Sequence, residues 1–236
     1  MSIHLVGGGW SDAAAPEVFG GFLRECAARA AGRRTPRVSL VLMGTDAEAL
    51  EYHERYVRAL GLAGEPHDLA ITRVEEGTPC PVSALEDVDG LFVGGGPTPE
   101  YHASLTPLFE QVRTHVGGGL PYLGFSAGAA IAAERAIIGG WRVDGVAVCP
   151  EDANEELDEL AVVDGIGLVP FGVDVHSSQW GTLGRLVGAV EAGLLTEGVA
   201  VDESTVVTVD EQLAVRGEGR ARRVVAGDGG VSVTAV

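Results

Sequence analysis

The sequence predicts an α/β domain in which a mostly parallel sheet is covered by helices on both faces. Short apolar runs alternate with segments of helical periodicity from the first residues onward. The apolar runs are continuous, which is typical of strands that are buried on both faces. The chain has 236 residues, a length that suits one substantial domain, and we expect a single domain over residues 1–236.

The N-terminal half of the chain carries five expected strands and four expected helices. The strands are residues 3–6, 37–43, 69–74, 90–93 and 121–125. Helical spacing of apolar residues covers 14–31, 46–60, 100–116 and 127–135. Ser11 or Asp12 is the expected N-cap of the first helix, and the second is expected to open at Thr45 or Asp46. Pro107 interrupts the third, because proline lacks a backbone donor.

The C-terminal third has a different pattern, rich in valine and glycine. One helical run remains, at residues 181–192, and the other apolar segments are 143–148, 165–175, 199–209 and 224–236. We interpret these segments as further strands and hairpins, some of them antiparallel. The acidic run 151–159 is expected to be a solvated surface loop.

Composition restricts the classes of partner and compartment. Lys and Arg number 16 against 34 Asp and Glu, so the formal net charge is −18. Such a surface disfavours sequence-independent binding of nucleic acid and docking on anionic lipid. No signal-peptide pattern and no long apolar stretch is visible, so we expect a cytoplasmic protein without membrane or nucleic-acid partners.

Cysteine and metal-ligand patterns are sparse. Cys26, Cys80 and Cys149 form no CxxC pair and are expected to be reduced structural thiols. No HExxH or comparable ligand cluster occurs, so we expect neither a metal nor an organic cofactor.

Residues 124–128 carry the pattern G-x-S-x-G between an expected strand and an expected helix. This is the setting of a nucleophile elbow, a tight turn that lifts a serine hydroxyl out of the backbone. Close neighbours in the turn must be small, and Gly124, Ala127 and Gly128 meet that need. Ser126 is therefore the candidate nucleophile, weighed against a structural turn, and the amide of Ala127 is a candidate oxyanion donor.

A serine nucleophile needs a base, and His176 is the best placed of the six histidines. It ends an expected strand, and α/β sheets hold their sites at the carboxyl ends of strands. The other histidines lie on expected amphipathic helices, inside the first strand or in a polar loop: His53, His102, His115, His4 and His67. The acid that orients the base stays open between Asp174, Asp202 and Glu203, since each lies on or just after an expected strand.

A second glycine-rich turn, residues 94–98, also follows an expected buried strand. The amide of Gly95 or Gly96 is a candidate second oxyanion donor, because glycine lets the main chain approach a ligand closely. A phosphate loop is the rival interpretation, but neither G-K-[ST] nor GxGxxG spacing is present. The first glycine cluster, residues 7–9, is interpreted as a ligand loop or equally as a tight turn.

Four segments carry a wider pattern along nearly the whole chain. They are GGGPTPEYHASL (94–105), GFSAGAAI (124–131), VDVHSSQWGTLGRL (173–186) and GVAVDESTVV (198–207). Together they resemble the dipeptidase E and cyanophycinase family of serine peptidases. The resemblance implies a three-layer fold like that of class I glutamine amidotransferases, with extra antiparallel strands near the C-terminus and a triad in the order Ser, His, Glu.

Motif by motif, the resemblance identifies Ser126 as the nucleophile, His176 as the base and Glu203 as the acid. The oxyanion hole matches the backbone of Gly95, Gly96 and Ala127. The candidate substrate contacts are Thr98, Asp174, Gln179 and Trp180.

The chain also departs from the cyanophycinase pattern. Cyanophycinases tend to have SQR where this chain has SQW at 178–180, and a GGDQ-like turn where residues 95–98 resemble the dipeptidase E form. Arg185 is retained, and we expect it to serve in packing or an ion pair.

These observations predict a hydrolase that cleaves amide bonds through an acyl-enzyme on Ser126. The resemblance implies aspartyl or β-aspartyl peptides as substrates, and a small peptide is the expected partner. A non-peptidase amidase or esterase and a non-catalytic binding module are the alternatives. The sequence leaves open the substrate side chain, a homodimer, a loop over the site, and a part for Asp174 or Asp202 in the charge relay.

Overall fold

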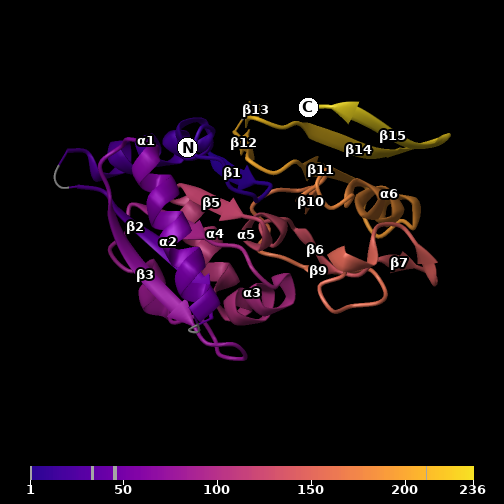
Figure 1. Cartoon of the computed structure of the whole chain (residues 1–236), viewed down its shortest axis with the longest axis horizontal. Helices are drawn as coiled ribbons and strands as arrows, with labels where there is room; N and C mark the ends of the chain where they lie inside the picture. The colour runs from indigo at the N-terminus through magenta and orange to yellow at the C-terminus, as the bar shows by residue number, and fades with distance from the viewer. Residues whose placement is uncertain (1, 33–34, 45–46, 211) are drawn as a thin grey trace.

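A seven-stranded sheet forms the centre of the molecule (Figure 1). The computed structural model describes residues 2–32, 35–44, 47–210 and 212–236. The strand order is β13-β12-β1-β5-β4-β2-β3, in which the five strands from β1 to β3 run parallel and β12 and β13 are antiparallel to their neighbours. The strands are β1 (Ile3–Val6), β2 (Arg37–Met43), β3 (Asp68–Val74), β4 (Gly90–Val93), β5 (Tyr122–Phe125), β12 (Thr205–Val209) and β13 (Leu213–Gly217). The expected mostly parallel α/β sheet is confirmed.

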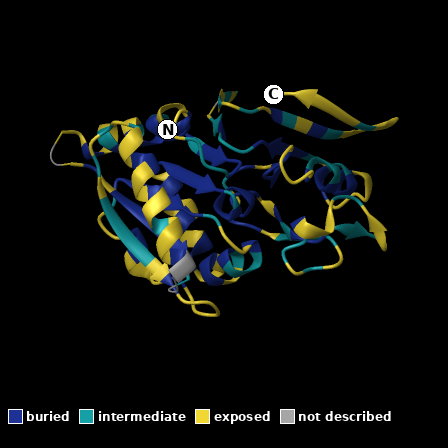
Figure 2. Cartoon of the chain, in the orientation of Figure 1, coloured by how far each residue is buried: buried dark blue, intermediate teal, exposed yellow. Residues whose placement is uncertain are grey.

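Helices cover both faces of this sheet, so the molecule has three layers. One face carries α1 (Ala15–Ala30) and α2 (Ala47–Leu62), and the other carries α3 (Thr98–Leu105), α4 (Phe109–Gly117) and α5 (Ala127–Ala130). Successive residues of a strand point to opposite faces, so Leu5 and Val6 enter different core clusters. Figure 2 shows the inner strands of the sheet as buried, the edge strand β3 as intermediate and the outer faces of α1 and α2 as exposed.

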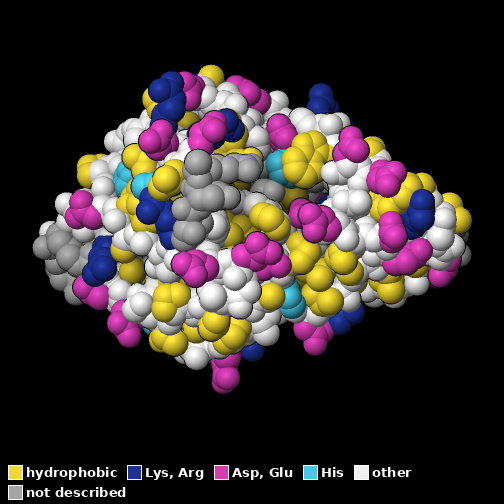
Figure 3. Space-filling model, turned by 60° about the horizontal axis from the view of Figure 1, so that its bottom comes forward, with side chains coloured by type: hydrophobic (Ala, Val, Ile, Leu, Met, Phe, Trp, Pro, Cys, Tyr) yellow, Lys and Arg dark blue, Asp and Glu magenta, His cyan; other side chains and the backbone are white. Residues whose placement is uncertain are grey.

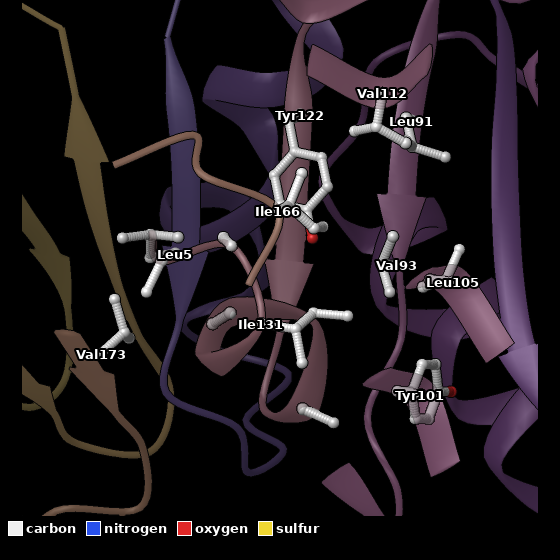
Figure 4. Close-up of a cluster of buried hydrophobic side chains, with 14 of the residues drawn as sticks. Leu5, Leu91, Val93, Tyr101, Leu105, Val112, Tyr122, Ile131, Ile166 and Val173 are labelled. Carbon is white, nitrogen blue, oxygen red and sulfur yellow. The ribbon is translucent and has the colours of Figure 1, made fainter. Parts of the chain in front are cut away.

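Figure 4 shows the core cluster on the α3 and α4 face. Leu91 and Val93 of β4 and Tyr122 of β5 meet Leu105 and Val112 from the helices above them. These side chains are at most 2% exposed, and each contributes about 1.5–3 kcal/mol on burial. The packing fixes the position of β5, at whose carboxyl end Ser126 lies.

A second sheet lies beside the first and contains four strands from the C-terminal part of the chain. Its order is β10-β11-β14-β15, with β10 and β11 parallel and the remaining pairs antiparallel. Its strands are β10 (Gly172–Asp174), β11 (Glu197–Val201), β14 (Ala221–Gly227) and β15 (Gly230–Ala235), and α6 (Leu183–Glu191) packs against it. Two small antiparallel pairs complete the chain: β6 (Arg135–Gly139) with β9 (Ala161–Asp164), and β7 (Arg142–Val143) with β8 (Val146–Ala147).

The Ala-rich segment corrects one expectation, because the helix predicted over 127–135 ends at Ala130 and residues 135–139 form β6. Residues 127–133 are buried, and the backbone after Ala130 pairs with residues 166–169 instead of extending the helix. Ile131 and Ala132 accept bonds from the amides of Ile166 and Leu168. Tertiary partners here outweigh the intrinsic helix preference of alanine.

Other helix boundaries also differ from the sequence pattern. The helix expected over 100–116 is two helices joined by the 3-10 turn η2 (Thr106–Leu108), where Pro107 lies. Ala14 is the N-cap of α1, in place of Ser11 or Asp12. The expected opening of α2 at Thr45 or Asp46 lies outside the described residues.

Three further findings concern membrane spans, thiols and metals. Within the described residues, the helices are too short or too polar to cross a bilayer, and His, Cys, Asp and Glu form no group of three that would bind a metal ion. Cys26, Cys80 and Cys149 are free thiols, and the first two are buried.

Candidate active site

Ser126 lies at the apex of a sharp turn between β5 and α5. Its φ is 51° and its ψ is −110°, a strained combination for a residue with a side chain. A Cβ on Gly124 would overlap the backbone of Gly128, and a Cβ on Gly128 would overlap Val93 O. The amide of Ser126 donates to Val6 O at 2.9 Å. The sequence pattern G-x-S-x-G therefore folds as the tight turn that it predicts, with the hydroxyl directed away from the sheet.

A chain of hydrogen bonds joins the three side chains that the sequence singled out. Ser126 Oγ lies 2.8 Å from His176 Nε2, and His176 Nδ1 lies 2.7 Å from Glu203 Oε1. The residues come from β5, from the end of β10 and from the β11–β12 turn. Both sheets are needed, because Ser126 follows β5 of the central sheet and His176 follows β10 of the second.

The glycine cluster at residues 7–9, left open by the sequence, packs against this chain of side chains. A Cβ on Gly8 would overlap Cε1 of His176, and a Cβ on Gly9 would lie 2.5 Å from the Cβ of Glu203. Gly7 O accepts the amide of His176 at 2.9 Å, and Gly8 O accepts the amide of Ser204 at 2.7 Å. The N-terminal turn thus holds the imidazole and the carboxylate in place, a role that the glycine run alone does not reveal.

The turn after His176 fixes the acid. Asp202 accepts bonds from the amide and hydroxyl of Ser178, at 3.0 and 2.7 Å, and Gln179 Oε1 accepts the amide of Glu203 at 3.0 Å. Of the three candidate acids, Glu203 alone contacts His176 Nδ1. Asp202 instead ties Ser178 to the β11–β12 turn.

Two backbone amides beside Ser126 have no acceptor among the described residues, those of Gly96 and Ala127. The amide of Gly95 is engaged, since it donates to the Tyr56 hydroxyl at 2.7 Å. Gly95 instead provides space, because a Cβ there would lie 2.8 Å from the Cβ of Ser126. Between the two candidate glycines, the amide of Gly96 is the one left for a ligand.

A cavity of about 570 Å³ opens over Ser126 and is large enough for a short peptide segment. Arg55, Tyr52 and Tyr56 of α2 contribute to its lining, together with Trp10 and Pro97. Part of the acidic run also lines it, namely Asp152, Glu155 and Glu156. This corrects the expectation that residues 151–159 form only a solvated loop. Figure 3 shows acidic side chains spread over one face of the molecule, in keeping with the net charge of −18.

Of the four residues expected to contact the substrate, Trp180 lines the cavity, and the other three lie outside its lining. Trp180 lines the cavity and is 44% exposed. Thr98 is buried and donates from its amide and hydroxyl to the Glu155 carboxylate, at 3.1 and 2.9 Å. Gln179 holds the amide of Glu203 and is not among the residues that line the cavity.

Asp174 also lies behind the site and not in it. Its buried carboxylate forms two bonds with Arg185, at 2.9 and 2.7 Å, so it is not available to a substrate. Arg185 Nη1 also donates to Ala153 O at 2.5 Å, which ties the acidic segment to β10. The ion pair expected for Arg185 is confirmed.

The surroundings of His176 favour a neutral imidazole. Burial lowers the pKa of His176 below its usual value of 6.5, and the Glu203 carboxylate acts against this by stabilising the charged ring. A neutral histidine is able to accept a proton from the serine hydroxyl, as a general base must. The arrangement places a serine hydroxyl, a neutral base and a carboxylate at one cavity, with the amides of Gly96 and Ala127, unbonded within the described residues, beside the serine. These are the groups that acyl transfer requires.

Comparisons with known proteins match this chain to a peptidase family. A family model described as "Peptidase family S51" matches residues 33–217. A curated cyanophycinase from Trichormus variabilis is 34% identical over 175 residues, which is 70% of this chain and 55% of that protein. A curated peptidase E from Shewanella denitrificans is 27% identical over 179 residues, covering 73% of this chain and 68% of that protein. The chain thus spans about half the length of the cyanophycinases it matches.

Solved structures show the same fold. The crystal structure of a peptidase from an acI-B1 Actinobacterium superposes with a TM-score of 0.67 at 15% identity, covering 100% of this chain and 96% of that one. A structure described as a putative peptidase E from Listeria monocytogenes gives a TM-score of 0.54 at 11% identity, covering 92% and 98%.

Proposed function

Since the chain belongs to peptidase family S51, we propose that it hydrolyses amide bonds of small peptides through an acyl-enzyme on Ser126. The single observation that supports this most is the unbroken path from Ser126 Oγ through the imidazole of His176 to Glu203, with steps of 2.8 and 2.7 Å. A structural serine at a turn needs neither a base nor a carboxylate behind that base.

Acylation begins when Ser126 Oγ attacks the carbonyl carbon of the substrate and its proton passes to Nε2 of His176. The carbonyl oxygen gains negative charge, which the amides of Gly96 and Ala127 stabilise by hydrogen bonds. Glu203 accepts a hydrogen bond from the Nδ1–H group of His176, which fixes the tautomer and stabilises the imidazolium. The imidazolium then gives its proton to the departing amine, and the C–N bond breaks.

Deacylation repeats the sequence with water as the nucleophile. The neutral His176 takes a proton from water, whose oxygen attacks the ester carbonyl of the acyl-enzyme. The same two amides stabilise the second tetrahedral intermediate, and His176 returns the proton to Ser126 Oγ as the acid product leaves. Acylation and deacylation together balance in atoms and electrons without an external oxidant, reductant or metal.

The resemblance of the four sequence motifs implies aspartyl or β-aspartyl peptides as substrates, and we extend the proposal to them. A carboxylate of such a substrate needs a cationic partner, and Arg55 is the one arginine among the described residues that line the cavity. The substrate's amino group has partners in the carboxylates of Asp152, Glu155 and Glu156. We assign Arg55 to the substrate carboxylate on this charge distribution. Its guanidinium pairs with Glu51 at 2.5 Å in an exposed contact that a substrate carboxylate can replace, whereas the pair between Arg185 and Asp174 is buried.

A peptide library offered to the purified protein tests the function. The wild type should cleave a subset of peptides and be labelled by a fluorophosphonate, whereas Ser126→Ala should do neither. Ser83→Ala, which alters an exposed serine, is the matched control and should behave as wild type. Cleavage of Asp-Xaa or isoaspartyl bonds would support the proposed substrates.

Two outcomes of this experiment would favour the alternatives. Turnover of simple esters or amides without cleavage of any peptide would indicate a non-peptidase hydrolase that uses the same serine. Identical behaviour of wild type and Ser126→Ala, with no labelling of either, would indicate a binding module.

A further inference from the structure

The indole of Trp180 lies flat against the imidazole of His176. The two ring centroids are 3.8 Å apart and the ring planes differ by 7°. The contact is built into one turn of chain, since the amide of Trp180 donates to the carbonyl of His176 at 2.8 Å. His176 has a φ of 54°, an unusual value that directs its side chain within this turn.

The stack completes the support of the imidazole. Its two nitrogens bond to Ser126 and Glu203, and the backbone at Gly8 fills the space next to Cε1. The two hydrogen bonds fix the positions of the ring nitrogens. They resist rotation of the ring about the line through those nitrogens only weakly. The indole covers one face of the ring and supplies that restraint.

Trp180 is also poorly explained as a core residue. Its side chain is 44% exposed and lines the cavity above Ser126, so about half of a large apolar surface stays in water. A residue that serves only in packing would be buried more fully. One face of the indole lies against the imidazole.

We propose that Trp180 is a positioning residue for His176: the indole holds the plane of the imidazole and stabilises the imidazolium that forms when Ser126 gives up its proton. The negative face of an indole attracts a cation, and such contacts change an equilibrium by about 3- to 30-fold. This role rests on the proposed function, because the imidazolium arises only if His176 acts as the base.

Other features near the ring affect the stability of the imidazolium in opposite directions. Glu203 and Asp174 stabilise the imidazolium, and Arg185 and burial oppose it. The cavity adds Arg55 and the carboxylates of Asp152, Glu155 and Glu156. These groups remain in place when Trp180 alone is changed, so a substitution there isolates the contribution of the stack.

The first test is the rate at which a fluorophosphonate labels Ser126 between pH 5 and 9. Trp180→Leu removes the aromatic face, so we expect the plateau rate to fall about 5- to 30-fold and the midpoint to move to lower pH. Trp180→Phe keeps an aromatic face and should label within about threefold of wild type. Trp141→Phe changes a tryptophan outside the cavity and should have no effect.

The second test does not depend on turnover. An imidazolium in contact with an indole quenches its emission, so the fluorescence difference between wild type and Trp180→Phe should titrate with His176. The same difference measured in a His176→Gln background should be flat with pH. Thermal unfolding of each variant shows whether the fold is retained.

The outcomes separate this inference from the proposed function. Wild type that is never labelled overturns the proposed function and the role of Trp180 with it. Labelled wild type, together with a Trp180→Leu variant that keeps the same rate and pH midpoint, overturns the role of Trp180 alone. A fluorescence difference that does not change with pH also overturns it.

Discussion

Gly8 and His176 are in contact across 168 residues of sequence, and the contact leaves no room for a side chain on the glycine. Gly8 has a φ of +93°, and a Cβ there would overlap the imidazole at Cε1. The N-terminal strand therefore ends in a turn whose shape is set by the ring packed against it. This relationship makes the base sensitive to a change far away in sequence.

Gly8→Ala should displace the imidazole and lower the rate of fluorophosphonate labelling about 100-fold or more, because a shift of about 1 Å at a reacting group has that effect. Gly64→Ala is the matched control, since Gly64 also has positive φ, at +80°, but has nothing within 4 Å of an added Cβ. Gly64→Ala therefore measures the effect of an alanine at positive φ without a clash of its side chain. Equal labelling of the two variants would contradict the packing argument.

Glu203→Gln should lower kcat/KM by about 10²- to 10⁴-fold, because an amide does not hold the imidazole in the required tautomer. Glu203 raises the pKa of His176 against the effect of burial, so its neutralisation lowers that pKa further. The acid limb of the pH profile should therefore move to lower pH. Glu218→Gln, which alters an exposed carboxylate bonded to Ser11, should leave the profile unchanged; an unmoved profile in Glu203→Gln would argue against the relay.

Arg55→Gln should reduce kcat/KM for aspartyl peptides about 10- to 100-fold, since a charged hydrogen bond is lost. Peptides with a neutral residue at that position should be affected little. Arg58→Gln is the matched control one turn along α2, where the guanidinium pairs with Asp12 on the surface. An equal loss on charged and neutral peptides would remove Arg55 from substrate recognition.

Arg185→Met should lower the free energy of unfolding by about 3–5 kcal/mol, because the Asp174 carboxylate is left buried without its partner. Arg223→Gln is the matched control, as Arg223 pairs with Glu197 at 2.6 Å on the surface, and it should cost less than about 1 kcal/mol. Urea denaturation measures both. Similar losses in the two variants would contradict the difference in burial.

Glu25 should make stability depend on acidic pH. Burial opposes its ionisation, but contacts with His4 and the Ser2 amide outweigh this and hold the pKa of Glu25 at about 2. A carboxyl with a lowered pKa in the folded state stabilises the fold above its unfolded pKa of about 4.3, and that contribution is lost as pH falls toward 2. Glu25→Gln should be about 1–2 kcal/mol less stable at pH 7 and equal to wild type near pH 2.

Glu76→Gln, at an exposed position, serves as the control for that comparison. A Glu25→Gln variant whose unfolding free energy matches wild type at pH 7 would show that the Ser2 and His4 contacts contribute nothing.

The five parallel strands of the central sheet were predictable from sequence because each is a short apolar run with a turn after it. The antiparallel strands were not: β13 (Leu213–Gly217) lies outside the expected segments, and β11 and β12 were merged in one expected run, 199–209. The same local logic located Ser126, since the small residues around it are required by the turn itself. It failed at residues 131–135, where alanine favours a helix but neighbouring chain supplies the backbone partners. It also left Gly8 and Gly9 without a role, because the atoms that crowd them belong to residues 176 and 203.

The sequence by itself determined the class of fold, the turn that carries the nucleophile, and the family motifs that single out His176 and Glu203. The tertiary structure decided which carboxylate reaches the imidazole, that Asp174 is held by Arg185, and that the indole of Trp180 covers the ring. The reason is physical: a local pattern records what the backbone needs from adjacent residues, whereas these contacts join two sheets and depend on how the sheets pack.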